Sequence, residues 1–227
     1  MSAPVPTRED YYRVLAECLS DDALVVTSLG NASYLWACLR ERPQNFYVED
    51  AMGLALPLAL GLAVAQPGRK VVGVEGDGGL LMHLGALVTV GAVAPRNLTV
   101  LLINNGVHAA SGGQPLTNPT LDLADLGRSA GLRRAENVSS PGGFRDAFLS
   151  ALEGEGPSLL ALATEPDLEE VEPPSPFNPV VIKQRFMEAI GAPRYVPIAF
   201  GKGRLVDVES TEATSGTVRP GASQDFG

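Results

Sequence analysis

Short apolar runs recur along the chain, and segments with helical spacing separate them. The runs are rich in Val and Leu and apolar on both faces, as strands of a parallel sheet are when helices cover both sides. We expect strands at residues 23–29, 70–76, 98–105 and 158–164, and Leu126, Ala130 and Leu132 continue the pattern towards another short strand. Helices are expected at residues 7–19, 31–40, 53–65, 79–92, 121–130, 141–153 and 178–190. The alternation predicts an α/β domain with three layers, a mainly parallel sheet between two layers of helices.

The pattern changes near residue 192, where the sequence becomes rich in Gly, Ser, Thr and Pro without a sustained period. We therefore expect one domain over residues 1–192 and a partly flexible C-terminal extension over 193–227. Within the extension, residues 194–208 are apolar enough to pack on something, such as a partner chain, whereas the stretch from Ser210 is typical of a flexible tail.

Composition narrows the classes of partner. The 227 residues suit one sizeable domain better than two small ones. A net charge of −9 argues against a nucleic-acid or anionic-membrane surface, because either would favour a basic face. The apolar run 53–65 is shorter than the roughly 20 residues of a membrane span, so we expect a buried helix there.

The cellular compartment is also suggested by the sequence. The first ten residues, MSAPVPTRED, lack the basic and apolar regions of a signal peptide. Cys18 and Cys38 fall in predicted helices without metal-like spacing, and we expect both to be buried thiols. Together these features favour a cytoplasmic protein.

Two polar clusters follow neighbouring strands. Gly76-Asp77-Gly78 ends the strand at 70–76, and Asn104-Asn105 ends the strand at 98–105. In open parallel sheets, ligands bind outside the carboxyl ends of the strands. Glycines there let the backbone approach a ligand, and the start of the next helix offers N–H groups to an anion. Neither the dinucleotide fingerprint nor a P-loop is present.

A carboxylate in an anion site requires a cation. Mg²⁺ prefers carboxylate, amide, carbonyl and phosphate oxygens, and the second cluster supplies the amide. Each cluster alone is typical of a turn. Because each closes a buried strand and one helix lies between them, the two together predict a diphosphate site bridged by a metal ion.

The two clusters also resemble a known motif. Gly76-Asp77-Gly78 followed by Asn105 looks like the thiamine-diphosphate motif of the decarboxylase and acetolactate-synthase superfamily. The resemblance covers about residues 8–190 and implies its diphosphate-binding, or PP-type, domain. VVTSLGNAS, NFYVEDAMGLALPLALGLA, GDGGLLMHLGALVTVG and NNGVHAASGGQPLTNP look most like the beta subunit of sulfopyruvate decarboxylase. They are also similar to the matching half of phosphonopyruvate decarboxylase.

The resemblance implies a set of cofactor ligands. The side chains of Asp77 and Asn105 and the backbone carbonyl of Val107 would bind Mg²⁺. The carbonyl of Asp50 would accept a bond from the aminopyrimidine, and Met52 would lie between the two rings, although a core methionine is the plain alternative. The expected contacts to the rest of thiamine diphosphate are Gly30, Asn31, Ala32, Gly76, Gly78 and Gly79.

We expect roles for four further polar side chains near this site. The resemblance places His108 where the family faces substrate, and a contact or proton-transfer role follows. The sulfopyruvate enzymes carry an aromatic residue near this position, so the substrate is left open. Gln114 lies in a loop resembling the family's STGGQ segment and would contact an anionic substrate head. His83 is expected to be structural, and Asn104 to tune the metal site.

The resemblance also indicates what is missing. In this superfamily a glutamate from a separate pyrimidine-binding domain activates the cofactor, and Glu49 and Glu75 lie in the wrong segments to replace it. We therefore expect a complementary, alpha-type subunit and an α2β2 assembly or a larger one.

The implied reaction is decarboxylation of a small 2-oxo acid, similar to sulfopyruvate or phosphonopyruvate, to an aldehyde. A carboligase subunit of the acyloin or acetolactate type is the rival within the superfamily. Two further alternatives are a non-catalytic relic or regulatory partner and a generic nucleotide-binding α/β protein. The last predicts that replacing Asp77 leaves ligand affinity unchanged.

Overall fold

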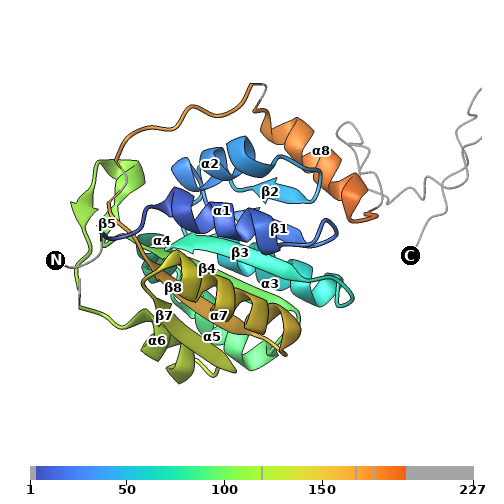
Figure 1. The fold of residues 1–227 in the computed structure, drawn as a ribbon. Helices are drawn as coiled ribbons and strands as arrows, with labels where there is room; N and C mark the ends of the chain where they lie inside the picture. The colour runs from blue at the N-terminus through green and yellow to red at the C-terminus, as the bar shows by residue number, and fades with distance from the viewer. Residues whose placement is uncertain (1–3, 119, 167, 176, 193–227) are drawn as a thin grey trace, which may run out of the picture.

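The protein folds around a six-stranded, all-parallel sheet (Figure 1). The computed structural model describes residues 4–192 except 119, 167 and 176. The strands follow the spatial order β2-β1-β3-β4-β8-β7. Their bounds are β1 Leu24–Thr27, β2 Asn45–Tyr47, β3 Val71–Gly76, β4 Leu98–Asn104, β7 Arg134–Val138 and β8 Ser158–Ala163.

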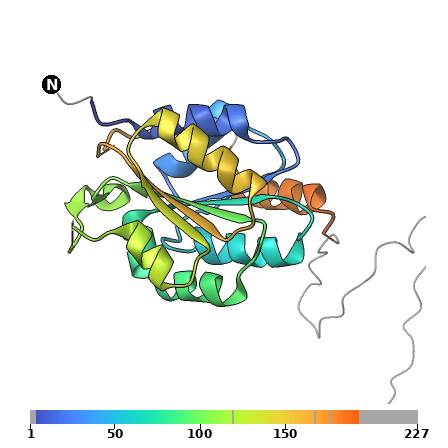
Figure 2. The ribbon, with the colours of Figure 1, turned by 60° about the horizontal axis from the view of Figure 1, so that its bottom comes forward.

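Helices cover both faces of the sheet, as the pattern predicted (Figure 2). Helices α1, α2 and α7 pack on one face, α3, α5 and α6 pack on the other, and α8 lies beside the edge strand β2. Their bounds are α1 Arg8–Cys18, α2 Asn31–Arg40, α3 Ala55–Ala65, α4 Asp77–Met82, α5 Gly85–Val93, α6 Leu123–Ser129, α7 Pro141–Glu153 and α8 Pro179–Ala189. The three-layer α/β fold is therefore confirmed.

The buried strands explain why their sequences are apolar on both faces. Every residue of β1, and all but the last residue of β3, β4 and β8, is buried. One face of the sheet packs on an aromatic cluster that contains Trp36, Tyr11, Tyr12 and Phe144, and the other packs on aliphatic side chains of α3 and α5. This sandwich fixes the carboxyl ends of the central strands at one edge of the sheet.

Helix starts differ in whether a side chain caps them. Thr7 and Asp10 form a capping box at α1, and Asp122, Ser140 and Asn178 cap α6, α7 and α8 with their side chains. Helix α2 has no such cap. It begins after Gly30, whose φ is +64°. Glycine adopts this conformation at little cost because it has no side chain. The first N–H groups of α2 are therefore not capped by a side chain.

The expected helix at 79–92 is wrong as a single element. The structure has two helices, α4 and α5, because His83 leaves helical geometry at φ −131°. The imidazole Nδ1 of His83 lies 3.2 Å from the carbonyl oxygen of Gly53, which fixes the break. This contact fits the structural role expected for His83.

Several short elements were not predicted. The three-residue strand β2 pairs with β1. After β4 the chain forms a hairpin of β5 Val107–His108 and β6 Gln114–Pro115, joined through the 3₁₀ turn Ala109–Ser111.

The expectation for Cys38 is also wrong, because this thiol is exposed, and Cys18 is only partly buried. Cys38 lies on the exposed side of α2, and Cys18, the last residue of α1, packs against the margin of the core.

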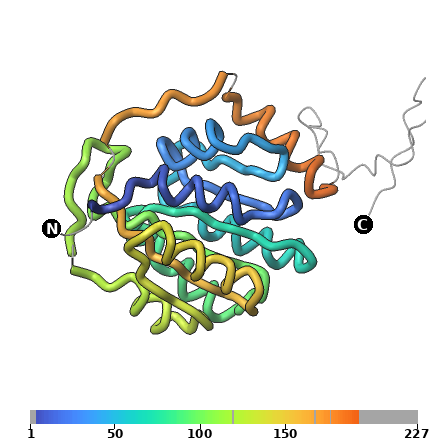
Figure 3. The backbone as a smooth tube through the Cα atoms, viewed as in Figure 1, coloured from blue at the N-terminus to red at the C-terminus, as the bar shows by residue number. Residues whose placement is uncertain are grey.

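A connector over residues 164–178 leads from β8 to α8 and passes along α2 (Figure 3). The Asn31 amide fastens it, donating to the Glu169 carbonyl at 2.6 Å and accepting from the Val171 N–H at 3.0 Å. The predicted extension 193–227 lies outside the described residues. Within residues 4–192, apart from the three gaps, no helix is long and apolar enough to cross a membrane.

Candidate cofactor site

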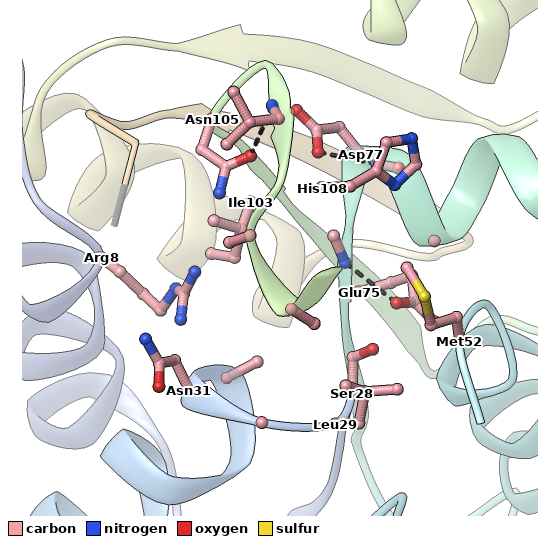
Figure 4. A pocket seen from close by; sticks show the side chains of 18 of the residues that line it. Arg8, Ser28, Leu29, Asn31, Met52, Glu75, Asp77, Ile103, Asn105 and His108 are labelled. Carbon is pink, nitrogen blue, oxygen red and sulfur yellow. Dashed lines mark hydrogen bonds between the residues drawn. The ribbon is translucent and has the colours of Figure 1, made fainter. Parts of the chain in front are cut away.

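A pocket of about 420 Å³ opens at the carboxyl ends of β1, β3 and β4 (Figure 4). This volume is in the range of small-molecule sites, roughly 300–1,000 Å³. The structure brings almost all of the predicted site residues to its wall. They are Gly30, Asn31, Ala32, Asp50, Met52, Gly76, Asp77, Gly78, Gly79, Asn105, Val107 and His108.

Asp77 lies at the centre of this arrangement. Its side chain is only 1% exposed, and burial raises the pKa of its carboxyl. Backbone N–H groups of Gly78 and Gly106 donate to its two oxygens, each at 2.7 Å, and oppose that rise. The carboxylate thus joins the start of α4 to the loop after β4.

The protein oxygens near Asp77 are too few to complete the coordination shell of a magnesium ion by themselves. Asn105 and Val107 line the pocket beside Asp77, whereas Asn104 does not. The Asn105 amide oxygen accepts the Val107 N–H at 3.1 Å, which fixes the amide in the loop. Among the described residues no three His, Cys, Asp or Glu side chains cluster as a metal site. One carboxylate, one amide and one carbonyl would supply part of an oxygen shell, which diphosphate oxygens would complete.

Glycines shape the pocket floor in two ways. A Cβ at Gly30 or Gly76 would meet nothing within 4 Å, so the backbone there is open to a ligand. At Gly78 a Cβ would come within 2.5 Å of the His108 ring, and at Gly79 within 2.4 Å of the Glu75 carboxylate. These two glycines let α4 pack closely against neighbouring side chains, so both patterns fit a cradle for an anionic group.

Glu75 is buried beside this cradle at 1% exposure, and Figure 4 shows it next to Met52 and Ser28. Burial raises the pKa of its carboxyl, opposed by bonds from the Ser28 hydroxyl and the N–H groups of Gly76 and Ala55. These donors lie 3.0 Å (Gly76) and 3.2 Å (Ala55) from its oxygens. The carboxylate therefore ties β3 to the end of β1 and the start of α3, the elements that surround the pocket.

The segment before α3 forms the opposite wall. Asp50 has a φ of +52°, a left-handed conformation that is uncommon for a residue other than glycine. Beside it, burial raises the pKa of Glu49, with a further rise from the charge of Asp50. The Glu49 Oε1 atom is buried without a hydrogen-bond partner among the described residues. Met52 follows on the same wall and points into the pocket (Figure 4).

His108 and Gln114 take different positions. The imidazole of His108 lies against Gly78 at the pocket, where the sequence placed it. Gln114 is exposed and is not one of the pocket-lining residues. Its side chain is held by Ser111, whose hydroxyl lies 2.9 Å away and whose carbonyl accepts its amide at 2.7 Å.

Some pocket residues were not found from the sequence. Arg8, Tyr34, Leu168 and Glu170 line the pocket. Arg8 looked like an ordinary polar residue at a helix start, and Leu168 and Glu170 belong to a connector without periodicity. Glu75 carried a usable signal, because a charge inside an otherwise apolar strand is rare unless something holds it.

The comparisons with known proteins agree with this geometry. Residues 28–162 match the family model "Thiamine pyrophosphate enzyme, C-terminal TPP binding domain". Phosphonopyruvate decarboxylase from Streptomyces viridochromogenes is 40% identical over 85% of this chain and 48% of its own length. Sulfopyruvate decarboxylase subunit beta from Methanocaldococcus jannaschii is 33% identical over 82% of this chain and 97% of its own length.

Solved structures give the same result for the fold. The thiamine diphosphate-dependent 4-hydroxybenzoylformate decarboxylase of Rhodococcus jostii RHA1 superposes with a TM-score of 0.64 at 26% identity, over 74% of this chain and 34% of that one. The chain thus spans about half of the phosphonopyruvate decarboxylase and a third of the solved structure, but nearly all of the beta subunit. With more than half of its residues matched by the family model, the chain belongs to the thiamine pyrophosphate enzymes, as the C-terminal-type domain that binds the cofactor.

Proposed function

We propose that the chain is the diphosphate-binding component of a two-component thiamine-diphosphate-dependent decarboxylase. Its substrate would be a small 2-oxo acid similar to sulfopyruvate or phosphonopyruvate. The buried Asp77 carries the proposal, since it faces Asn105 and Val107 in a pocket of cofactor size. Domain limits of 1–192 and a separate extension from 193 are part of the same proposal.

Different residues would bind the two parts of the cofactor, the diphosphate at one end of the pocket and the rings at the other. Asp77, Asn105 and the Val107 carbonyl would hold Mg²⁺. The backbone of the Gly30–Ala32 turn and the Gly79 N–H would hold the diphosphate, and the Gly78 N–H would join them by leaving the Asp77 carboxylate. The Asn31 side chain is already bound to the connector, so this residue would contribute its backbone.

The other end would hold the ring system. The Asp50 carbonyl would accept a hydrogen bond from the aminopyrimidine, and Met52 would separate the two rings. Gly76 would allow the backbone to approach the cofactor closely. Thiamine diphosphate, when bound, supplies a carbon nucleophile and an electron sink. The chain's part is to bind and orient it. His108 borders the same pocket and would contact the substrate. Gln114 stays a prediction, and reaching the substrate would require its bonds to Ser111 to open.

A partner subunit is the second half of the proposal. Two relatives named phosphonopyruvate decarboxylase are about twice the length of the matched region, whereas the relatives named sulfopyruvate decarboxylase subunit beta are nearly covered. A complementary subunit would therefore supply the pyrimidine-binding domain and its glutamate, in an α2β2 complex or a larger one. The exposed apolar side chains of α3 and α5, described below, give it a surface to bind.

The test is an assay of the complex purified from the host through a tagged copy of this chain. We expect CO₂ and an aldehyde from sulfopyruvate or phosphonopyruvate, and no activity from this chain alone. An acyloin product would identify the carboligase alternative instead. Full activity of the isolated chain, or no turnover of any 2-oxo acid by the complex, would contradict the proposal.

A further inference from the structure

Arg8 is a charged residue in the pocket that no role assigned so far uses. It is the first residue of α1 and is only 6% exposed. The capping box of Thr7 and Asp10 fixes the helix at this point. Figure 4 shows its guanidinium directed into the pocket, on the side where Asn31 and Asn105 lie. The sequence and the fold thus place a buried cation at a ligand site.

The charge balance of the pocket makes this placement informative. Five of its described lining residues carry carboxyl groups, namely Glu49, Asp50, Glu75, Asp77 and Glu170. Arg8 is the one arginine or lysine among them. The planar fork of a guanidinium matches phosphate oxygens well. A bound diphosphate would bring such oxygens into this pocket, together with negative charge that one divalent ion does not fully neutralise.

Position decides which anion Arg8 would meet. Its neighbours in the close-up belong to the phosphate side of the proposed binding mode, since Asn31 lies in the turn after β1 and Asn105 in the metal loop. Met52, at the ring end, lies on the opposite side of the pocket (Figure 4). A substrate would approach the rings in this binding mode, so Arg8 would lie away from the place where a 2-oxo acid reacts.

We propose that Arg8 binds the terminal phosphate of thiamine diphosphate and thereby selects the diphosphate over the monophosphate. This inference rests on the proposed function, because it concerns the same cofactor. It adds a residue from α1, which lies outside the matched family region of residues 28–162.

The experiment compares two ligands on the full chain at fixed Mg²⁺. Affinities for thiamine diphosphate and for thiamine monophosphate, which lacks the terminal phosphate, are measured by calorimetry or competition. We expect Arg8→Gln to weaken diphosphate binding about 10-fold or more, and monophosphate binding by less than about 2-fold. Arg8→Lys should keep part of the preference, because the charge remains without the fork.

Arg13→Gln is the matched control, since Arg13 lies on the same helix with its side chain 62% exposed. It should bind both ligands as the wild type does. Thermal unfolding without ligand checks that Arg8→Gln folds, and a general loss of folded protein would not change the ratio of the two affinities.

Two results would overturn the inference. One is an unchanged ratio in Arg8→Gln. The other is an unchanged cofactor affinity with a raised KM of the complex for an anionic 2-oxo acid, which would place Arg8 at the substrate. If the wild-type chain binds neither thiamine ligand, the proposed function itself fails, and that outcome is distinct from both.

Discussion

The two helix layers of the molecule differ in what they show to their surroundings. The layer of α1, α2 and α7 carries charged pairs on its outer surface, including Glu9–Arg13, Asp21–Arg40 and Glu17–Arg145. In the opposite layer α6 carries the Asp125–Arg128 ion pair, but α3 and α5, the apolar layer, contain no charged residue. The outer side of α3 and α5 exposes Leu58, Val64 and Val88, the last at 58%.

The charged layer is typical of a solvent-exposed surface, whereas the apolar layer is typical of a surface that binds another protein. A helix that is apolar all round is normally buried on all sides, and a cluster of exposed apolar side chains is typical of an interaction site. The apolar layer also adjoins the pocket, because Leu54 follows the Asp50–Met52 wall and α4 leads from Asp77 to the exposed Met82. The uncharged surface of α3 and α5 therefore lies next to the site to which the proposed partner subunit would bring its glutamate.

The largest expected effect tests how tightly the apolar layer is packed. A Cβ at Gly91 in α5 would lie 1.7 Å from the backbone oxygen of Ala130, so Gly91→Ala should destabilise the fold by about 3 kcal/mol or more. Gly142→Ala in α7 meets nothing within 4 Å and should be neutral or stabilise by about 0.5 kcal/mol. Urea unfolding measures both, and equal effects would show that α5 is not packed on Ala130 as described.

The next effect tests the two outer surfaces. Val88→Asp should weaken the complex with the partner subunit about tenfold or more, because it places a charge in the buried interface. Leu149→Asp, on α7 and 39% exposed, should leave the complex intact. Both should change the free energy of unfolding of the chain by less than about 0.5 kcal/mol. Size-exclusion chromatography of the purified complexes decides, and loss of the complex with Leu149→Asp alone would reverse the comparison.

The smallest expected effects concern one carboxyl group from each side. The pKa of Asp10 in α1 is lowered, first by the backbone hydrogen bond at Thr7. The Asp10 carboxylate therefore stabilises the fold at pH values above its unfolded pKa, and this stability is lost as the pH falls through its folded pKa. The pKa of Glu49 is raised, first by burial, so its contribution is present below the unfolded value and lost as the pH rises through the folded pKa.

The two groups should therefore give opposite pH profiles in the absence of ligand. Relative to wild type, Asp10→Asn should lose least stability at low pH and more as the pH rises past about 4. Glu49→Gln should instead become more stable relative to wild type as the pH rises above about 4.5. Thermal melts from pH 3 to 7 measure both differences, and parallel profiles for the two variants would contradict these assignments.

The sequence predicted the long elements and the centre of the site well. Helices α2 and α7 have the predicted bounds, and the central strands differ by two residues or fewer at each end, because long apolar periods and caps such as Ser140 with Pro141 are local signals. The clusters at Asp77 and Asn105 were placed together because parallel strands end at one edge. These features depend on neighbours in the chain or on a general rule of sheet geometry.

What the sequence did not show depends on distant contacts. Strand β2 is only three residues long and forms through pairing with β1. The break at His83 depends on the carbonyl of Gly53, and the position of the connector depends on Asn31. Arg8 reaches the pocket only because α1 packs beside α2. No local pattern encodes such meetings.

The measurement that tests the account most directly is calorimetric binding of thiamine diphosphate to the full chain with Mg²⁺ and with chelator. We predict that binding requires the metal and that Asp77→Asn lowers the affinity about 100-fold or more. The control Asp146→Asn, on the exposed side of α7, should bind as the wild type does. Binding that ignores the metal and survives Asp77→Asn unchanged would contradict the account and favour a generic nucleotide-type pocket.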